Sequence, residues 1–156
     1  MGPVGDMTVE NWNAVIQTNL TSGFYAAKAQ VPAMVKRGGG SLLFTSSFVG
    51  YSNGGMPGMG AYAAAKAGLV GLAQSLAADH GADGVRVNTL LPGGTLTAMA
   101  GDDADTHAFI AGLHSLTRVA QPAEIAQVAL FLLPDRAGFV TGSPVLAAGG
   151  VSVRLV

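Results

Sequence analysis

Tyr62 and Lys66 stand four residues apart within a run of helix-forming residues. Side chains at this spacing share one face of a helix, so the phenol and the ammonium are expected side by side. A phenol in water releases its proton near pH 10, and a neighbouring cation favours the phenolate and lowers that value. A tyrosine tuned in this way can exchange a proton with an oxygen that changes between hydroxyl and carbonyl. The pair therefore predicts half of the chemistry that oxidises an alcohol or reduces a ketone.

A Tyr-x-x-x-Lys pair alone is weak support for a catalytic site, because most such pairs are surface contacts worth ~0.2–0.5 kcal/mol. The neighbouring segments favour the catalytic interpretation. Residues 42–47 have the pattern of a buried strand that ends in hydroxyls, and residues 85–93 that of a strand that ends in a Pro-Gly turn. Strand, helix and strand together predict a parallel crossover. It brings Ser47 and the pair Pro92 and Gly93 to the same carboxyl edge of a sheet.

The composition limits the class of protein. The chain of 156 residues fits one domain, and it is 49% hydrophobic but only 11% charged. So few charges indicate that much of the surface is buried against other subunits or against a missing part of the fold. The net charge of −1 and the lack of a basic run argue against nucleic acid or an anionic membrane as a partner. The absence of cysteine is compatible with a reducing compartment such as the cytoplasm.

The remaining segments predict further helices and one more strand. Thr8 is a candidate cap for a long helix that runs to about Lys36, and Pro32 is expected to bend this helix near its end. Its apolar stripe includes Phe24 and also Asn19, whose amide must find a hydrogen-bond partner there. Two interpretations of Asn19 stay open. It is either a core amide that bonds to the backbone or a functional group. Further elements are expected as helices at 60–80, around 107–114 and at 121–133, and as a short strand at 144–148.

The order of these elements predicts an α/β fold. We expect a truncated Rossmann-like, three-layer arrangement in which helices flank a partial parallel sheet. The glycine-rich loop at 48–60 lies between two candidate catalytic residues and is expected to wall a substrate site. His107 and His114 share a helix face, but no carboxylate joins them at metal-ligand spacing. Both are therefore expected at the surface, and no metal site is predicted.

Taken together, these residues resemble the carboxyl-terminal half of a short-chain dehydrogenase/reductase, and the resemblance spans essentially the whole chain. The motifs that carry it are Thr-Asn-Leu around Asn19, Thr-Ser-Ser ending at Ser47, Tyr-Ala-Ala-Ala-Lys-Ala-Gly from Tyr62, the strand 85–93 with Thr97 after it, Gln-Pro-Ala-Glu at 121–124 and Val-Thr-Gly at 140–142. Together these motifs are highly specific for that family, whereas Tyr-x-x-x-Lys alone is not.

The resemblance implies an oxidoreductase that interconverts a secondary alcohol and a ketone with NAD or NADP. It implies Tyr62 as general acid/base, Ser47 as hydrogen-bond partner of the substrate oxygen, and Lys66 as the group that tunes the phenol and holds the nicotinamide ribose. Asn19 would position a water in a proton relay. The cofactor would be contacted by Tyr62, Lys66, Pro92, Gly93, Thr95 through its backbone, and Thr97 through its hydroxyl. A homo-oligomer, either dimer or tetramer, is also implied.

The sequence departs from the family pattern in three places, which limits what the resemblance implies for this chain. Fifteen positions separate Ser47 from Tyr62, slightly more than in many relatives, so substrate specificity is not carried across. The segment 146–150 has no aspartate before its glycine pair, where the family commonly has one. The strands and the glycine-rich turn that bind adenosine and pyrophosphate are missing, so the chain is interpreted as a fragment and the choice between NAD and NADP stays open. The alternative is a non-catalytic fragment or oligomerisation module, in which helices 8–36 and 60–80 pair the subunits.

Overall fold

The structure is a computed structural model that describes residues 2–52 and 56–153. Its centre is a parallel sheet of three strands in the order β1-β2-β3. The strands are β1 (Gly40–Thr45), β2 (Val85–Pro92) and β3 (Pro144–Ala147). Because both strand pairs are parallel, all three strands end at the same edge of the sheet. The predicted α/β fold with a partial parallel sheet is confirmed.

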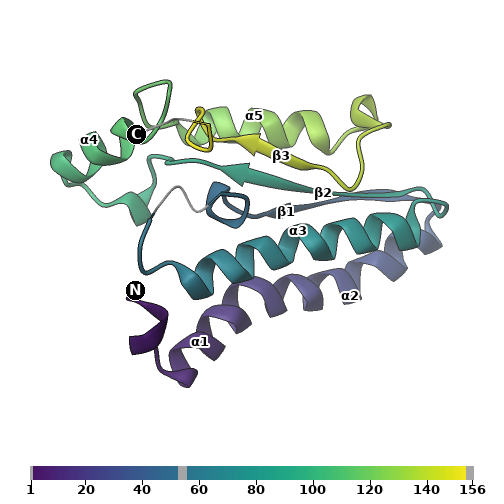
Figure 1. Cartoon of the computed structure of the whole chain (residues 1–156). Helices are drawn as coiled ribbons and strands as arrows, with labels where there is room; N and C mark the ends of the chain where they lie inside the picture. The colour runs from purple at the N-terminus through teal and green to yellow at the C-terminus, as the bar shows by residue number, and fades with distance from the viewer. Residues whose placement is uncertain (1, 53–55, 154–156) are drawn as a thin grey trace.

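Helices cover both faces of the sheet, which gives the three-layer arrangement. Figure 1 shows α2 and α3 side by side below the sheet, α5 above it, and α4 beyond the carboxyl end of β2. The helices are α1 (Val9–Ile16), α2 (Ser22–Lys36), α3 (Gly60–His80), α4 (Ala104–Gly112) and α5 (Pro122–Leu132). The helices predicted at 60–80 and 121–133 and the strand predicted at 144–148 are therefore found. In the part of the chain that the structure describes, no helix is both long enough and apolar enough to cross a bilayer.

The helix predicted at 8–36 forms, but it contains an irregular turn. Thr8 caps its start through its side-chain oxygen. The segment Gln17–Thr21 then forms a π-helical turn between α1 and α2. Ala27 and Val31 are buried in the core, whereas Phe24 is 46% exposed. Phe24 shares its helix face with Ala27 and Val31, as the predicted stripe requires, and lines a groove between α2 and α3.

The main core lies between the sheet and the pair α2 and α3. Its buried members are Ala27, Val31, Leu42, Phe44, Leu69, Ala73, Ala77, Val85 and Val87. Small residues bring the two helices close to each other and to the sheet. A Cβ added to Gly23 on α2, for example, would lie 2.7 Å from Cδ2 of Leu69 on α3. This packing holds α3 against the sheet, so its first turns lie at the carboxyl edge.

On the other face of the sheet, Arg86 and Asn88 of β2 join α5 to β3. The Arg86 guanidinium donates to the carbonyl oxygens of Leu132, Leu133, Pro134 and Val140 at 2.9–3.2 Å. Asn88 donates to the Val140 carbonyl at 2.8 Å and accepts from the backbone N–H of Ser143 at 3.0 Å. These bonds satisfy carbonyls at the end of α5 and fix where β3 begins.

Candidate active site

Lys66 lies where α3 meets the end of β1. Its Nζ donates to the carbonyl oxygen of Thr45 at 3.1 Å, and it lies 5.4 Å from the centre of the Tyr62 ring. Burial lowers the pKa of the Lys66 ammonium from its ordinary value. A cation over the face of an aromatic ring is attracted to it. The structure therefore brings the two candidate residues of α3 together and joins Lys66 to the sheet.

The two serines that follow β1 are both buried. Ser46 Oγ donates to the carbonyl oxygen of Lys66 at 2.7 Å, which joins the end of the strand to α3. Ser47 Oγ accepts the backbone N–H two residues later at 3.3 Å and begins a short 3-10 turn, η3 (Phe48–Gly50). A Cβ added to Gly50 would lie 2.6 Å from the carbonyl carbon of Lys66. The backbone after Ser47 is thus in direct contact with the first turns of α3.

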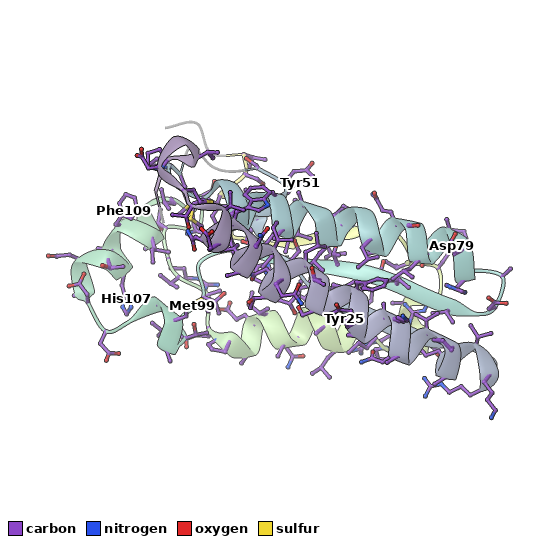
Figure 2. All side chains as sticks on the ribbon, turned by 90° about the horizontal axis from the view of Figure 1, so that it is seen from below. Tyr25, Tyr51, Asp79, Met99, His107 and Phe109 are labelled. Carbon is purple, nitrogen blue, oxygen red and sulfur yellow. The ribbon has the colours of Figure 1, made fainter. Side chains whose placement is uncertain are left out.

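Tyr62 is the most buried of the three tyrosines. Tyr25 on α2 and Tyr51 after η3 lie at the surface (Figure 2), 56% and 62% exposed, whereas Tyr62 is half-buried. Its ring packs in an apolar cluster built by Phe48, Val49, Ala148 and Val151, with Met56, Met59, Ala63 and Leu113 against it. The ring is therefore held beside the residues that directly follow Ser47. Part of the loop predicted to wall the substrate site, residues 53–55, lies outside the described residues.

The turn after β2 lies at the same edge of the sheet as the Tyr62 cluster. It follows Pro92, and the Gly93 N–H donates to the Ala147 carbonyl at 3.1 Å. Thr95 Oγ1 donates to the Gly93 carbonyl at 3.1 Å, and Thr97 is exposed. Four of the six residues that the family resemblance assigns to the cofactor, Pro92, Gly93, Thr95 and Thr97, therefore lie together at the end of the middle strand. Their contact with a cofactor stays a prediction.

Asn19 lies in the π-helical turn and is half-buried. Its Nδ2 donates to the carbonyl oxygen of Val15 at 3.0 Å, so its amide finds a backbone partner within the helix. The same turn borders α3 close to Lys66, since a Cβ added to Gly68 would lie 2.7 Å from Leu20 Cδ2. This proximity is compatible with a water-positioning role for Asn19, which stays a prediction.

The predicted surface position is wrong for one of the two histidines, His107 and His114. His107 is half-buried, with its Nε2 2.8 Å from the Gly101 carbonyl oxygen. His114 is only 2% exposed, so the predicted surface position is wrong for this residue. The spacing argument failed because α4 ends at Gly112 and the chain then turns His114 onto the segment that follows β2. Within residues 2–52 and 56–153, no three His, Cys, Asp or Glu side chains are placed to share a metal ion.

Comparison with known proteins agrees with this arrangement. A family model described as enoyl-(acyl carrier protein) reductase matches residues 1–152. A 2,5-dichloro-2,5-cyclohexadiene-1,4-diol dehydrogenase from Sphingobium indicum is 39% identical over 153 residues, which are 95% of this chain and 60% of that protein. A cyclohexanol dehydrogenase from an Acinetobacter species is 37% identical over 149 residues, which are 96% of this chain and 58% of that protein. The chain thus spans about 60% of the length of the curated relatives that it matches.

A solved structure extends the likeness to three dimensions. Carveol dehydrogenase from Mycobacterium avium, solved in complex with NAD, is 30% identical and superimposes with a TM-score of 0.91. This match covers 97% of this chain and 60% of that chain. With the family model matching nearly the whole sequence, the motifs and the fold together show that the chain belongs to the short-chain dehydrogenase/reductase family.

Proposed function

We propose that this chain provides the proton-transfer half of an oxidoreductase that interconverts a secondary alcohol and a ketone with NAD or NADP. The observation that carries the proposal is the position of Lys66. Its ammonium is bonded to the Thr45 carbonyl at the end of β1 and lies over the ring of Tyr62. A cation, a phenol and the hydroxyl of Ser47 then lie at the carboxyl edge of a parallel sheet, which is where such sheets bind ligands.

The proton chemistry follows from these three side chains. In ketone reduction, the Tyr62 hydroxyl donates its proton to the carbonyl oxygen, and in alcohol oxidation the phenolate accepts the proton of the hydroxyl. The Lys66 ammonium holds its positive charge 5.4 Å from the centre of the Tyr62 ring, beside the group that exchanges the proton. Ser47 Oγ already accepts a backbone N–H, so its own hydrogen can be donated to the substrate oxygen. The nicotinamide, when bound, supplies or accepts the hydride.

The donors at this edge fit a nicotinamide nucleotide. The Lys66 ammonium has three N–H groups, of which one is donated to the Thr45 carbonyl, and the other two suit the hydroxyls of a ribose. Thr97, at the exposed end of the turn after β2, has a hydroxyl that suits the carboxamide of the nicotinamide. Lys66, Tyr62 and the turn from Pro92 to Thr97 are the groups that would hold the nicotinamide end of the cofactor.

A groove between α2 and α3 supports assembly with a second copy of the chain, as a dimer or as half of a tetramer. The groove has a volume of about 690 Å³, and Val31, Val35, Leu72 and Leu76 line its apolar floor. Lys28 and Lys36 border it on α2, and Asp79 on α3 and Asp83 in the turn after α3 border it on the other side. Under two-fold symmetry, the lysines of one copy can face the aspartates of the other. Analytical sedimentation compares the parent with a Leu76→Asp variant. An oligomeric parent and a monomeric variant would support the groove as the contact surface between two copies.

Titration with NADH and NADPH separates the enzyme from a non-catalytic assembly module. Saturable binding of either dinucleotide with a dissociation constant below ~1 mM supports the enzyme. Cyclohexanol is the first substrate to assay, because one relative is a cyclohexanol dehydrogenase. Lys66→Met should weaken dinucleotide binding, whereas Lys28→Met, which changes an exposed lysine on α2, should leave it unchanged. A parent chain that binds neither dinucleotide would refute the enzyme and leave the assembly module.

A further inference from the structure

His114 bridges α4 and the turn that follows β2. A backbone N–H can only donate, so the N–H of Gly94, 2.9 Å from Nε2, requires this nitrogen to be the acceptor. The ring hydrogen is then on Nδ1, which donates to the carbonyl oxygen of Ile110 at 2.7 Å. Ile110 belongs to the last turn of α4. One imidazole therefore holds a helix end on one side and the β2 turn on the other.

Three glycines close around this ring. A Cβ added to Gly93 would lie 2.7 Å from Nε2 of His114, one added to Gly94 would lie 2.8 Å from Cε1, and one added to Gly149 would lie 3.0 Å from Cδ2. Gly149 also has a φ of 55°, in the left-handed region that favours glycine. Gly93 and Gly94 follow β2, and Gly149 follows β3. The imidazole therefore contacts the carboxyl ends of two strands at once.

The turn after β2 is held from two other sides as well. The Gly93 N–H donates to the Ala147 carbonyl at 3.1 Å, which joins the turn to β3. The Ala120 N–H donates to the Gly94 carbonyl at 2.9 Å, which joins the turn to the segment before α5. His114 adds an anchor at the N–H of Gly94. Removal of this acceptor would leave a half-buried N–H unpaired and favour a different conformation of the turn.

We propose that His114 is a positioning residue that holds the turn Pro92–Thr97 in the shape that contacts the nicotinamide. The inference rests on the proposed function, because the turn matters for activity only if a dinucleotide binds there. The imidazole acts through Gly94 and does not touch the reacting atoms. Because α4 ends at Gly112, two residues before His114, a movement of α4 shifts the imidazole and with it the turn Pro92–Thr97.

Two variants of matched length separate the hydrogen bond from the packing of the ring. His114→Gln carries an amide oxygen that can accept from the Gly94 N–H, whereas His114→Met fills similar space without a comparable acceptor. Hydrogen exchange of the Gly94 amide is measured by NMR, and dinucleotide affinity by NADH and NADPH fluorescence. Relative to the glutamine variant, the methionine variant should show about tenfold faster exchange at Gly94 and an about tenfold higher dissociation constant.

Equal effects of the two variants on exchange and affinity would assign His114 to packing alone and overturn the inference. A methionine variant that binds dinucleotide as tightly as the parent would overturn it too. Failure of the proposed function has a different signature, because the parent chain itself would then bind neither NADH nor NADPH. In that case the proposed function and the cofactor role of His114 are both refuted, whatever rate of hydrogen exchange is measured at the Gly94 amide.

Discussion

Replacement of Gly50 by alanine tests the contact between the end of β1 and the helix that carries Tyr62 and Lys66. The added Cβ would stand 2.6 Å from the carbonyl carbon of Lys66 and 2.7 Å from the backbone nitrogen of Ala67. Ordinary contact begins at 3.4 Å, so η3 or α3 must move by about 0.8 Å, the difference between 3.4 and 2.6 Å. Both near atoms belong to the helix backbone, so no side chain can rotate away to relieve the clash.

The expected cost follows from this overlap. Overpacking of a well-packed site costs roughly 1–3 kcal/mol of unfolding free energy. In a domain of this size 1 kcal/mol corresponds to about 2–4 °C, so the midpoint of thermal unfolding should fall by roughly 2–12 °C. Gly71→Ala on the same helix is the matched control, since its Cβ would meet no heavy atom within 4 Å. That variant should gain about 0.5–1 kcal/mol, because alanine is favoured over glycine inside a helix.

Thermal unfolding followed by circular dichroism compares the two variants directly. Turnover of a secondary alcohol gives a second readout, because a displacement near 1 Å between Ser47 and Tyr62 can slow a reaction by about 10²-fold. If Gly50→Ala unfolds at the same temperature as Gly71→Ala, η3 does not press on α3 and the reasoning about this edge is refuted.

Three further changes test other parts of the structure. Thr89 Oγ1 is buried without a hydrogen-bond partner among the described residues, so Thr89→Val should raise the urea-unfolding free energy by about 1–2 kcal/mol, and a decrease would reveal a partner. Two hydrogen bonds lower the pKa of Glu124 from an ordinary 4.5 to about 2, the larger effect coming from the Arg118 guanidinium and the smaller from the Gln121 N–H. This interaction therefore stabilises the fold above pH 4.5 and is lost as the pH falls towards 2; urea unfolding at several pH values should show that loss in the parent and not in Glu124→Gln. Thr117 has a φ of 53°, so Thr117→Gly should raise the unfolding temperature and Thr117→Ala should not; equal temperatures would show that this backbone is unstrained.

The ends of helices and strands could be predicted because short-range signals mark them. Thr8 caps the first helix through its side chain, as expected for a threonine before an apolar pattern. Pro122 occupies the first turn of α5, where its missing N–H costs nothing. The neighbourhood of Tyr62 and Lys66 was also predictable, since a spacing of four fixes it within one helix.

The features that escaped prediction depend on contacts between residues far apart in the chain. The π-helical turn borders α3 through Leu20 and Gly68, and such a contact between two helices cannot be seen in the periodicity of one of them. Arg86 bonds to carbonyls 46–54 positions later, and no local motif announces such a partner. The burial of His114 similarly depends on glycines that follow two different strands. In each case the sheet brings the partners together.

The most direct test of the catalytic assignment is the turnover of a secondary alcohol at saturating dinucleotide in the parent, Tyr62→Phe and Tyr51→Phe. Tyr51 is the matched control because it lies near the same edge but is 62% exposed. Loss of the Tyr62 hydroxyl should lower kcat by about 10²–10⁴-fold with dinucleotide affinity retained, while Tyr51→Phe should match the parent. Full turnover by Tyr62→Phe would contradict the role given to its phenol.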